Sequence, residues 1–541
     1  MVIRSTVGLP TNGARLGWPL RSASHHLFSS IVSKVLNPAI RASLVSPYRV
    51  PEYVVLGSVG LVIAVVGAVS ARRSPISWLG AVPVGGFRPR APRWASVTWY
   101  RHPPVMVTVT LVGVAVTAAW TVFSLLTSQR GFVDLSVYRI GVLTWWQRGD
   151  IYGVLPPTGI GVSLPFTYPP FAVVALGPLA ILGWEWTIVC LTILSLVCLA
   201  VVIYLTVRSA WPNGGIRGAV VGTAVMLPLS LFTEPVRDTI WFGQVNLLLM
   251  ALVALDCLVV TPRWPRGLLI GIAAAIKLTP AVFLLFFLLR KDYRAAVTMA
   301  VSGVVATAIG FLADWSGSFT FWFGSSGGAH AVGDSAALLN QSLAGGIARI
   351  GLSSQAETVI WVVVVAALAV FATAGVRKAL RTGSVPLAMA ITAGFGLIAS
   401  PISWGHHWVY IVPVIIVMVA DGIQRRQRGW LLAAAAAVAV YHAAAFLRLD
   451  IAGEWPPVRL LEENSFVLAA ITLLVGYSAT AVWRRVAAGV IALRRVVALA
   501  LVAWPSVGLR SVGRSAGWRS RSVASSSRGG VVEPVPSTSD N

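Results

Sequence analysis

The sequence predicts an all-α polytopic membrane protein, and two observations carry this prediction. The 541-residue chain is 57% hydrophobic and only 11% charged, whereas soluble domains contain about 25% charged residues. Apolar runs of about 17–25 residues, the length of a membrane-crossing helix, also recur along most of the chain. We therefore expect about 11–13 transmembrane helices, since a helix satisfies its own backbone hydrogen bonds in lipid.

The N-terminal residues 1–104 form a basic extension. Residues 1–52 are polar and rich in Ser, Arg and Pro, without the apolar core and cleavage site of a signal peptide. Residues 53–70 are apolar enough for one transmembrane helix. The following segment, 71–104, carries a series of arginines and is expected to be cytoplasmic.

Charge sets the expected orientation of the rest. The formal net charge is +24, which in a soluble protein would suggest a nucleic-acid partner. Here the arginines lie in the tails and in short loops between apolar runs, as the positive-inside rule describes. The basic loops are 208–217, 263–266, 290–294, 377–381 and 425–428. The sequence thus indicates membrane lipids as partners, not nucleic acid.

The remaining loops are poor in Arg and Lys and are expected outside. They are 128–168, 233–244, 314–358, 401–408 and 448–464. We assign 105–485 to one transmembrane domain and 486–541 to a basic, largely disordered cytoplasmic tail. This places the protein in the plasma membrane, with these loops facing the cell exterior.

Two apolar stretches interrupt a simple helix count. The run 267–289 begins and ends beside basic loops, so we expect two short helices broken at 277–280, where a proline follows a lysine. Such a break in the membrane is tolerated where it lines a cavity. The run 170–182 is too short to cross comfortably and predicts a half-helix or an interfacial helix.

Polar residues at the predicted outer face are the candidates for chemistry. Asp134 follows the apolar run 105–127 by a few residues, in a chain with only 18 acidic residues. A carboxylate there could act as a general base toward an acceptor hydroxyl. Asp134 could instead cap a helix or pair with Arg139.

Cations near the same face could stabilise a departing phosphate. Lys277 lies within an apolar run, where a cation is costly and is usually paired or functional. Arg237 is a second candidate, although Glu234 three residues earlier could form a local ion pair with it.

His406 and His407 are adjacent, and they could instead be ordinary interfacial residues. We predict no metal site, because adjacent histidines point in different directions on a helix and no third ligand has matching spacing. The further candidates for substrate binding are Tyr138, Gln244, Asn246, Asn340 and Gln341. Cys190, Cys198 and Cys257 lie in apolar runs and are interpreted as core residues.

Seven short motifs occur in order along 105–485. They are F-V-D-L-S-V-Y (132–138), L-P-F-T-Y-P-P-F (164–171), T-E-P-V-R (233–237), G-Q-V-N-L-L-L-M (243–250), K-L-T-P (277–280), N-Q-S (340–342) and S-P-I-S-W-G-H-H-W-V (400–409). Together they resemble glycosyltransferase family 87, which has the GT-C membrane fold. Within the family they are most similar to mycobacterial-type enzymes that add α-1,2-mannose to phosphatidylinositol mannosides.

The resemblance implies a reaction and part of its machinery. The donor would be polyprenyl-phosphate mannose on the outer leaflet, the acceptor a lipid-anchored mannoside, and the anomeric carbon would be inverted without a metal or cofactor. The family's base aspartate maps onto Asp134 and its histidine pair onto His406 and His407, of which we favour His407. Glu234, Arg237 and Lys277 fall on motif positions, with roles inferred from their charges.

Two kinds of alternative remain. A related enzyme could branch lipomannan or lipoarabinomannan with α-1,2-mannose, or transfer another polyprenyl-phosphate sugar such as arabinofuranose. A transporter or flippase for lipid-linked sugars would instead need midplane charges and repeat symmetry. The sequence offers one such lysine and no internal repeat.

Overall fold

The computed structural model describes residues 102–127, 131–324, 335–447, 461 and 463–483. Within these ranges the chain folds into helices, and no strand forms beyond one isolated bridge between Asn340 and Trp404. The expected helix at 53–70 and the expected tail at 486–541 lie outside the described residues. The all-α prediction is confirmed for the part that the structure describes.

Among the residues that the structure describes, six helices are long and apolar enough to cross a membrane. They are α4 (Pro103–Thr127), α7 (Trp184–Ala210), α13 (Tyr293–Ala313), α16 (Ser354–Arg381), the pair η7 (Gly405–Tyr410) and α18 (Ile411–Gln424), and the helix Ser465–Trp483. A seventh forms if α8 (Gly215–Ser230), preceded by η4 (Pro212–Gly214), and α9 (Glu234–Phe242) are one span bent by 74°.

The expected 11–13 spans therefore exceed what length and composition support in the described residues. The expectation counted every apolar run, but several runs form helices of only 10–17 residues. The helices of this length are α6 (Phe171–Ile181), α10 (Asn246–Leu258), η5 (Thr279–Val282) continued by α12 (Phe283–Arg290), and α17 (Val385–Ala399). The helix α11 (Leu268–Ile276) is shorter still. The remaining helices are α14 (Trp315–Phe323), α15 (Leu343–Ala348) and α19 (Arg428–Leu447).

Both expected interruptions are present. The run 267–289 breaks between α11 and α12, and Lys277 takes an extended conformation with φ −151° and ψ 129°. Pro280 lies in the first turn of η5, where its ring fits a helix start but not a helix interior. The run 170–182 forms the single short helix α6.

The segment after α4 differs from the expected loop, because α5 (Val133–Trp146) occupies much of it. Gly131 and Phe132 both have positive φ, 63° and 51°, and so turn the chain into a new helix. Leu135, Tyr138 and Val142 are fully buried at helical spacing, which gives α5 one core-facing side. Asp134 thus lies in the first turn of a helix.

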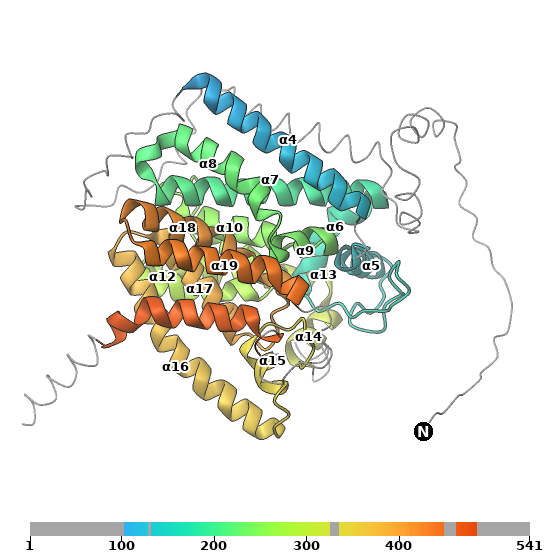
Figure 1. Ribbon diagram of the computed structural model, residues 1–541. Helices are drawn as coiled ribbons and strands as arrows, with labels where there is room; N and C mark the ends of the chain where they lie inside the picture. Colours follow the sequence, from blue (N-terminus) through green and yellow to red (C-terminus); the bar gives the residue numbers. More distant parts are fainter. Residues whose placement is uncertain (1–101, 128–130, 325–334, 448–460, 462, 484–541) are drawn as a thin grey trace, which may run out of the picture. The chain divides into compact units, whose positions relative to one another are not determined.

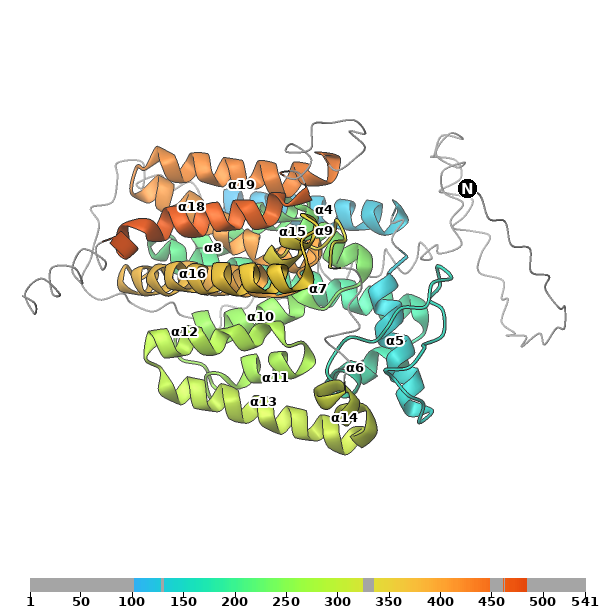
Figure 2. The ribbon, with the colours of Figure 1, turned by 90° about the horizontal axis from the view of Figure 1, so that it is seen from below.

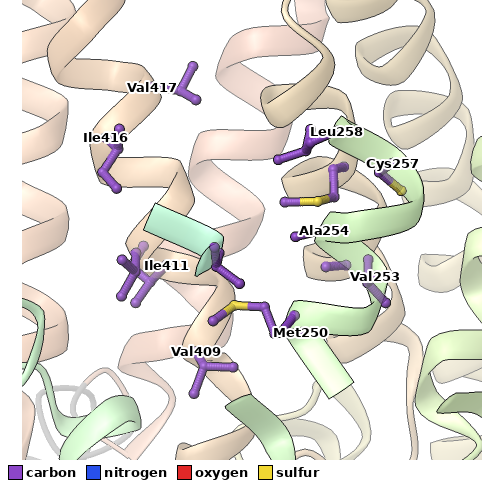
Figure 3. Packing of buried hydrophobic residues seen from close by; sticks show 14 of the residues in the cluster. Met250, Val253, Ala254, Cys257, Leu258, Val409, Ile411, Ile416 and Val417 are labelled. Atoms are coloured by element: carbon purple, nitrogen blue, oxygen red, sulfur yellow. The ribbon is translucent and has the colours of Figure 1, made fainter. Parts of the chain in front are cut away.

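The buried side chains form two clusters. The larger one joins α7, α10, α17 and α18, and Figure 3 shows part of it, with Met250 to Leu258 on α10 and Val409 to Val417 on η7 and α18. The smaller cluster joins α5, α6, the start of α7 and residues of α10 and α11. Both clusters include residues of α10 and of α11, the helix that ends at the Lys277 break.

The predicted outer loops gather at one end of the helices. Figures 1 and 2 both place α5, α6, α9 and α14 there. The indole N–H of Trp145 donates to the carbonyl of Ala313, and the main-chain N–H of Gln341 donates to the carbonyl of Ser403. At the basic end, Gln424 donates to the carbonyl of Ala210. The sequence-based division into two loop sets therefore matches the contacts.

Candidate active site

Lys277 is the centre of a polar cluster built from three segments. Its Nζ lies 3.0 Å from Oδ1 of Asn246, at the start of α10, and 2.9 Å from Nε2 of His407, in η7. It also lies 5.5 Å from the ring centroid of Tyr168. The helix break exposes the lysine to these partners, because an extended residue between two short helices is not confined to one helix face.

Asp134 faces this cluster from α5. It is partly exposed by area, but protein atoms surround the carboxylate, and burial raises its pKa to about 6. A hydrogen bond from the Gln244 side chain and the positive charge of Lys277 oppose that rise. The carboxylate is therefore deprotonated at neutral pH and still basic enough to accept a proton.

Two tyrosines hold Gln244 in place. The hydroxyl of Tyr138, one turn after Asp134 on α5, donates to Oε1 of Gln244 at 2.7 Å and lies 2.9 Å from the hydroxyl of Tyr168. The Gln244 Nε2 lies 3.3 Å from the Tyr168 hydroxyl. Because Oε1 already accepts from Tyr138, the amide presents its NH₂ group to Asp134.

The two histidines act through different atoms. The main-chain carbonyl of His406 accepts bonds from Thr239 and Asn246, both at 3.0 Å. The His407 ring instead contacts Lys277 directly. A protonated Lys277 donates to Nε2 of His407, because an ammonium group has no acceptor. The rings are 4.8 Å apart and nearly perpendicular.

Asn340 and Gln341 are fully buried. Their side-chain amides form hydrogen bonds with main-chain groups. Oδ1 of Asn340 accepts from the amides of Ser342 and Ser403, and its Nδ2 donates to the carbonyl of Pro401. Gln341 bonds the carbonyl of Glu463 and the amide of Phe466. The Asn340 bonds tie the N-Q-S motif to the segment that leads into the histidine pair, and the Gln341 bonds tie it to the start of the helix Ser465–Trp483.

The charged residues of α9 make contacts of their own. Arg237 pairs with Asp238 at 3.3 Å, and its guanidinium carbon lies 4.8 Å from the centroid of the Trp241 ring. Glu234 is buried at the start of α9, and Oε1 would lie 3.3 Å from a Cβ at Gly405, just before the histidine pair.

The alternative roles considered for Asp134 are not what the structure shows. The N-cap of α5 is Phe132. Arg139 directs its guanidinium to the carbonyls of Leu179, Ala180 and Leu182, where it caps the end of α6.

Tyr168 was not among the candidate residues. It joins the cluster through its hydroxyl, beside Tyr138, and through its ring, beside Lys277. Its carbonyl accepts a hydrogen bond of 2.7 Å from Tyr152. The sequence feature that could have identified Tyr168 was its position in the L-P-F-T-Y-P-P-F motif, which served only for the family resemblance.

The assembled groups suit one class of chemistry. A carboxylate with a raised pKa can take a proton from a hydroxyl, and a neighbouring ammonium can stabilise an anionic leaving group. Of the predicted site residues, the structure brings together Asp134, Tyr138, Gln244, Asn246, Lys277 and His407, with His406 joined through its carbonyl.

Comparison with known proteins agrees with this chemistry. The profile of glycosyltransferase family 87 matches residues 166–401. A polyprenol-phosphate-mannose-dependent alpha-(1-2)-phosphatidylinositol mannoside mannosyltransferase of Mycolicibacterium smegmatis is 35% identical over 408 residues, 70% of this chain and 88% of the relative. Its counterpart of the same description in Mycobacterium tuberculosis is 35% identical over 419 residues, 74% of this chain and 90% of the relative.

A third relative has a related description. A polyprenol-phosphate-mannose-dependent alpha-(1-2)-phosphatidylinositol pentamannoside mannosyltransferase of Mycobacterium tuberculosis is 32% identical over 366 residues, 66% of this chain and 81% of the relative. No solved structure matches the chain significantly. The chain is a glycosyltransferase and belongs to glycosyltransferase family 87, a family of GT-C membrane enzymes.

Proposed function

We propose that the protein transfers mannose from polyprenyl-phosphate mannose to a phosphatidylinositol mannoside, forming an α-1,2 linkage with inversion at the outer face of the plasma membrane. The observation that carries the proposal is the meeting of Asp134, Lys277 and His407. The names of the relatives support the donor and the acceptor class. The charge pattern of the loops supports the outward orientation.

In the proposed reaction, Asp134 takes the proton of the acceptor hydroxyl. The hydroxyl oxygen forms a bond to the anomeric carbon while the bond from that carbon to the phosphate oxygen breaks. Negative charge grows on the departing polyprenyl phosphate, and Lys277 is placed to stabilise it. The reaction as proposed uses these side chains and needs no metal ion or cofactor.

The other polar residues support this arrangement. Asn246 bonds both Lys277 and the carbonyl of His406, so it sets the position of the lysine relative to the histidine loop. Asn340 and Gln341 hold the same loop from its other side. Glu234 and Arg237 on α9 remain proposed substrate-binding residues, acting from the edge of the cluster.

The direct test is transfer of radiolabelled mannose. Membranes that contain the protein are supplied with polyprenyl-phosphate [³H]mannose and a set of phosphatidylinositol mannosides. We expect labelled mannolipid from the wild type and none from Asp134→Asn expressed at the same level. No transfer to any acceptor by the wild type, beside an active family member, would overturn the proposal.

A second candidate acceptor is the longer mannoside, because two pentamannoside mannosyltransferases are also relatives, at 32% and 33% identity. Branching of lipomannan or transfer of another polyprenyl-phosphate sugar are further alternatives. Linkage analysis and mass spectrometry of lipids from a deletion strain separate them. Loss of higher mannosides supports the phosphatidylinositol mannoside acceptor, and intact mannosides with unbranched lipomannan support the branching activity.

A further inference from the structure

An apolar cavity lies away from the reactive cluster, at the basic end of the helices. The helix α18 connects the two regions: it begins directly after η7, which holds His407, and its last residue, Gln424, lines the cavity. The 14 residues of α18 correspond to about 20 Å of helix. The cavity lining on this helix begins only at Ile416, so the cavity is separate from the active site.

The cavity has a volume of about 190 Å³ and lies between α7, α8 and α18. The helix α7 packs against both of the others, and Figure 1 shows them beside it. None of the described side chains that line the cavity is charged. On α18 the lining extends from Ile416 to Gln424, about 12 Å of helix. Ile423 belongs to the lining and is exposed, so the cavity opens to the outside, and we call it the basic-end groove.

The basic-end groove lies at a depth where acyl chains surround the protein. Both α7 and the pair of η7 with α18 are long and apolar enough to cross a membrane. A groove along the last turns of these helices therefore adjoins the membrane leaflet at the basic end. A dry apolar cavity of about 150 Å³ is enough to hold a benzene molecule, so this groove has space for several methylene groups.

One side of the groove's end carries two arginines that follow α18. The side-chain amide of Gln424 donates to the carbonyl of Ala210 at 2.8 Å and so joins the ends of α18 and α7. Arg425 and Arg426 come directly after Gln424, and both are exposed. Arg426 has a positive φ of 53°, so the chain turns away from the helix direction at this point.

The other side carries Arg208, from the last turn of α7. Its guanidinium donates to the carbonyl of Pro212 at 3.3 Å, next in the chain to Trp211, which lines the groove. The segments 208–217 and 421–428 together contain five arginines and one acidic residue, Asp421, so their formal charge is +4. An uncharged groove thus ends between two strongly basic segments.

We propose that the basic-end groove binds an anionic phospholipid from the membrane leaflet at that end, with an acyl chain in the groove and the phosphate at Arg208 and Arg426. Guanidinium groups bind phosphate through charge-assisted hydrogen bonds, and the chain gains close van der Waals contacts with the lining. A chain that leaves the bilayer for the groove exchanges one apolar environment for another. Charge should therefore set a preference for anionic over neutral lipid.

The groove itself is tested by filling it. Ala420 lies in the lining, so Ala420→Phe places a large side chain in the space that the acyl chain needs. Ala435→Phe is the matched control, because Ala435 is exposed on α19 and outside the groove lining.

The basic segments are tested by removing two charges at a time. The double variant Arg208→Gln, Arg426→Gln removes one arginine on each side of the groove. The double variant Arg377→Gln, Arg381→Gln is its control, because it removes two exposed arginines of α16 that lie in another basic loop and outside the groove lining.

The measurement is native mass spectrometry of the full-length protein, titrated in detergent with phosphatidylglycerol or with phosphatidylcholine of the same acyl chains. The wild type should retain one phosphatidylglycerol in preference to phosphatidylcholine. Ala420→Phe should bind phosphatidylglycerol roughly tenfold more weakly. The Arg208, Arg426 pair should weaken it roughly 30-fold and leave phosphatidylcholine unchanged. Both controls should match the wild type, and the yield of monodisperse protein reports folding.

Other outcomes would overturn the proposal. Equal retention of the two lipids by the wild type would exclude a role for the arginines, and equal weakening by both arginine pairs would assign the preference to overall charge. Unchanged binding in a folded Ala420→Phe would place the lipid elsewhere. Inorganic phosphate in millimolar excess should not displace the lipid, and complete displacement would show that the arginines bind a free phosphate without the groove. The readout needs no mannose transfer, so it stands apart from the proposed function.

Discussion

Tyr138 donates a hydrogen bond of 2.7 Å to Oε1 of Gln244, and this bond decides which end of the amide faces Asp134. An amide held in this orientation donates to the carboxylate and favours its ionised form. With the oxygen and nitrogen exchanged, it would repel the same anion. Through its bond to Gln244, Tyr138 thereby controls the proton affinity of the base.

Tyr138→Phe should therefore raise the pKa of Asp134. The variant removes the hydroxyl that fixes Gln244, so the carboxylate loses a reliable donor while burial continues to favour its protonated form. Since the base works deprotonated, the rise of kcat/KM with pH should move to higher pH by about one unit. The pH profile of mannose transfer measures the shift.

Tyr152→Phe is the control for this experiment, because its hydroxyl bonds the carbonyl of Tyr168 and makes no bond to Gln244. A uniform loss of rate at all pH values in Tyr138→Phe would indicate a packing effect and contradict the assignment.

In the wild type, transfer should decline as the pH falls through about 6. Burial raises the pKa of Asp134 to about 6, so the fraction of ionised base is nearly complete at pH 8, about half at pH 6 and small at pH 5. Log kcat/KM against pH should have a slope near one below the midpoint. A midpoint near 4, the value of an ordinary exposed aspartate, would show that burial does not act on this carboxylate.

The sequence predicted much of the membrane domain because its signals are local. Apolar runs, arginine-rich loops and a proline after Lys277 each act on their own segment, and the broken helix at 277–280 followed from them. The number of spans did not follow. Whether a short apolar run such as 171–181 crosses the membrane depends on which helices pack around it, and this information is not local.

The sequence named candidate residues for the site but did not predict which of them contact one another. A buried cation needs partners, which is why the sequence drew attention to Lys277, but its partners Asn246 and His407 are 31 and 130 positions away and could not be named from it. The pairing of Arg237 with the adjacent Asp238 was not anticipated, because a spacing of three allowed a contact with Glu234 but gave no basis for choosing between the two carboxylates. Tyr168 was missed because an aromatic residue in a proline-rich segment has many ordinary explanations.

Lys277→Ala should lower kcat/KM for the donor by roughly 10²-fold, because the leaving phosphate loses its cation. Lys277→Arg should restore part of the activity, since it keeps the charge but changes the donor geometry. Turnover with saturating acceptor measures the effect, and yield of monodisperse protein in detergent serves as the control for folding. Full activity in Lys277→Ala, together with an inactive Lys277→Arg variant, would show that the reaction does not depend on the lysine.

The two histidines should differ on substitution, because His407 acts through its ring and His406 through its carbonyl. His407→Ala removes the contact with Lys277 and should lower kcat by at least tenfold. His406→Ala retains the carbonyl that accepts from Thr239 and Asn246 and should lower kcat less than His407→Ala, because the His406 ring does not contact Lys277. Steady-state kinetics of both variants at one pH decide the order, and a larger loss of kcat in His406→Ala would reverse our assignment of the reactive histidine.

Asn340→Ala should destabilise the fold more than it alters the chemistry. The substitution leaves the buried main-chain amides of Ser342 and Ser403 without their acceptor, while the carbonyl of Pro401 keeps its bond from the Ser342 hydroxyl, and each unsatisfied group costs about 1–3 kcal/mol. Thermal unfolding in detergent should therefore begin several degrees lower than in the wild type, because the segment before the histidines loses its anchor.

Asn340→Asp is the informative comparison, since it keeps an acceptor for the two amides but cannot donate to Pro401. Its stability should fall between the other two. Wild-type stability of Asn340→Ala combined with a raised KM for either substrate would instead support direct binding by Asn340.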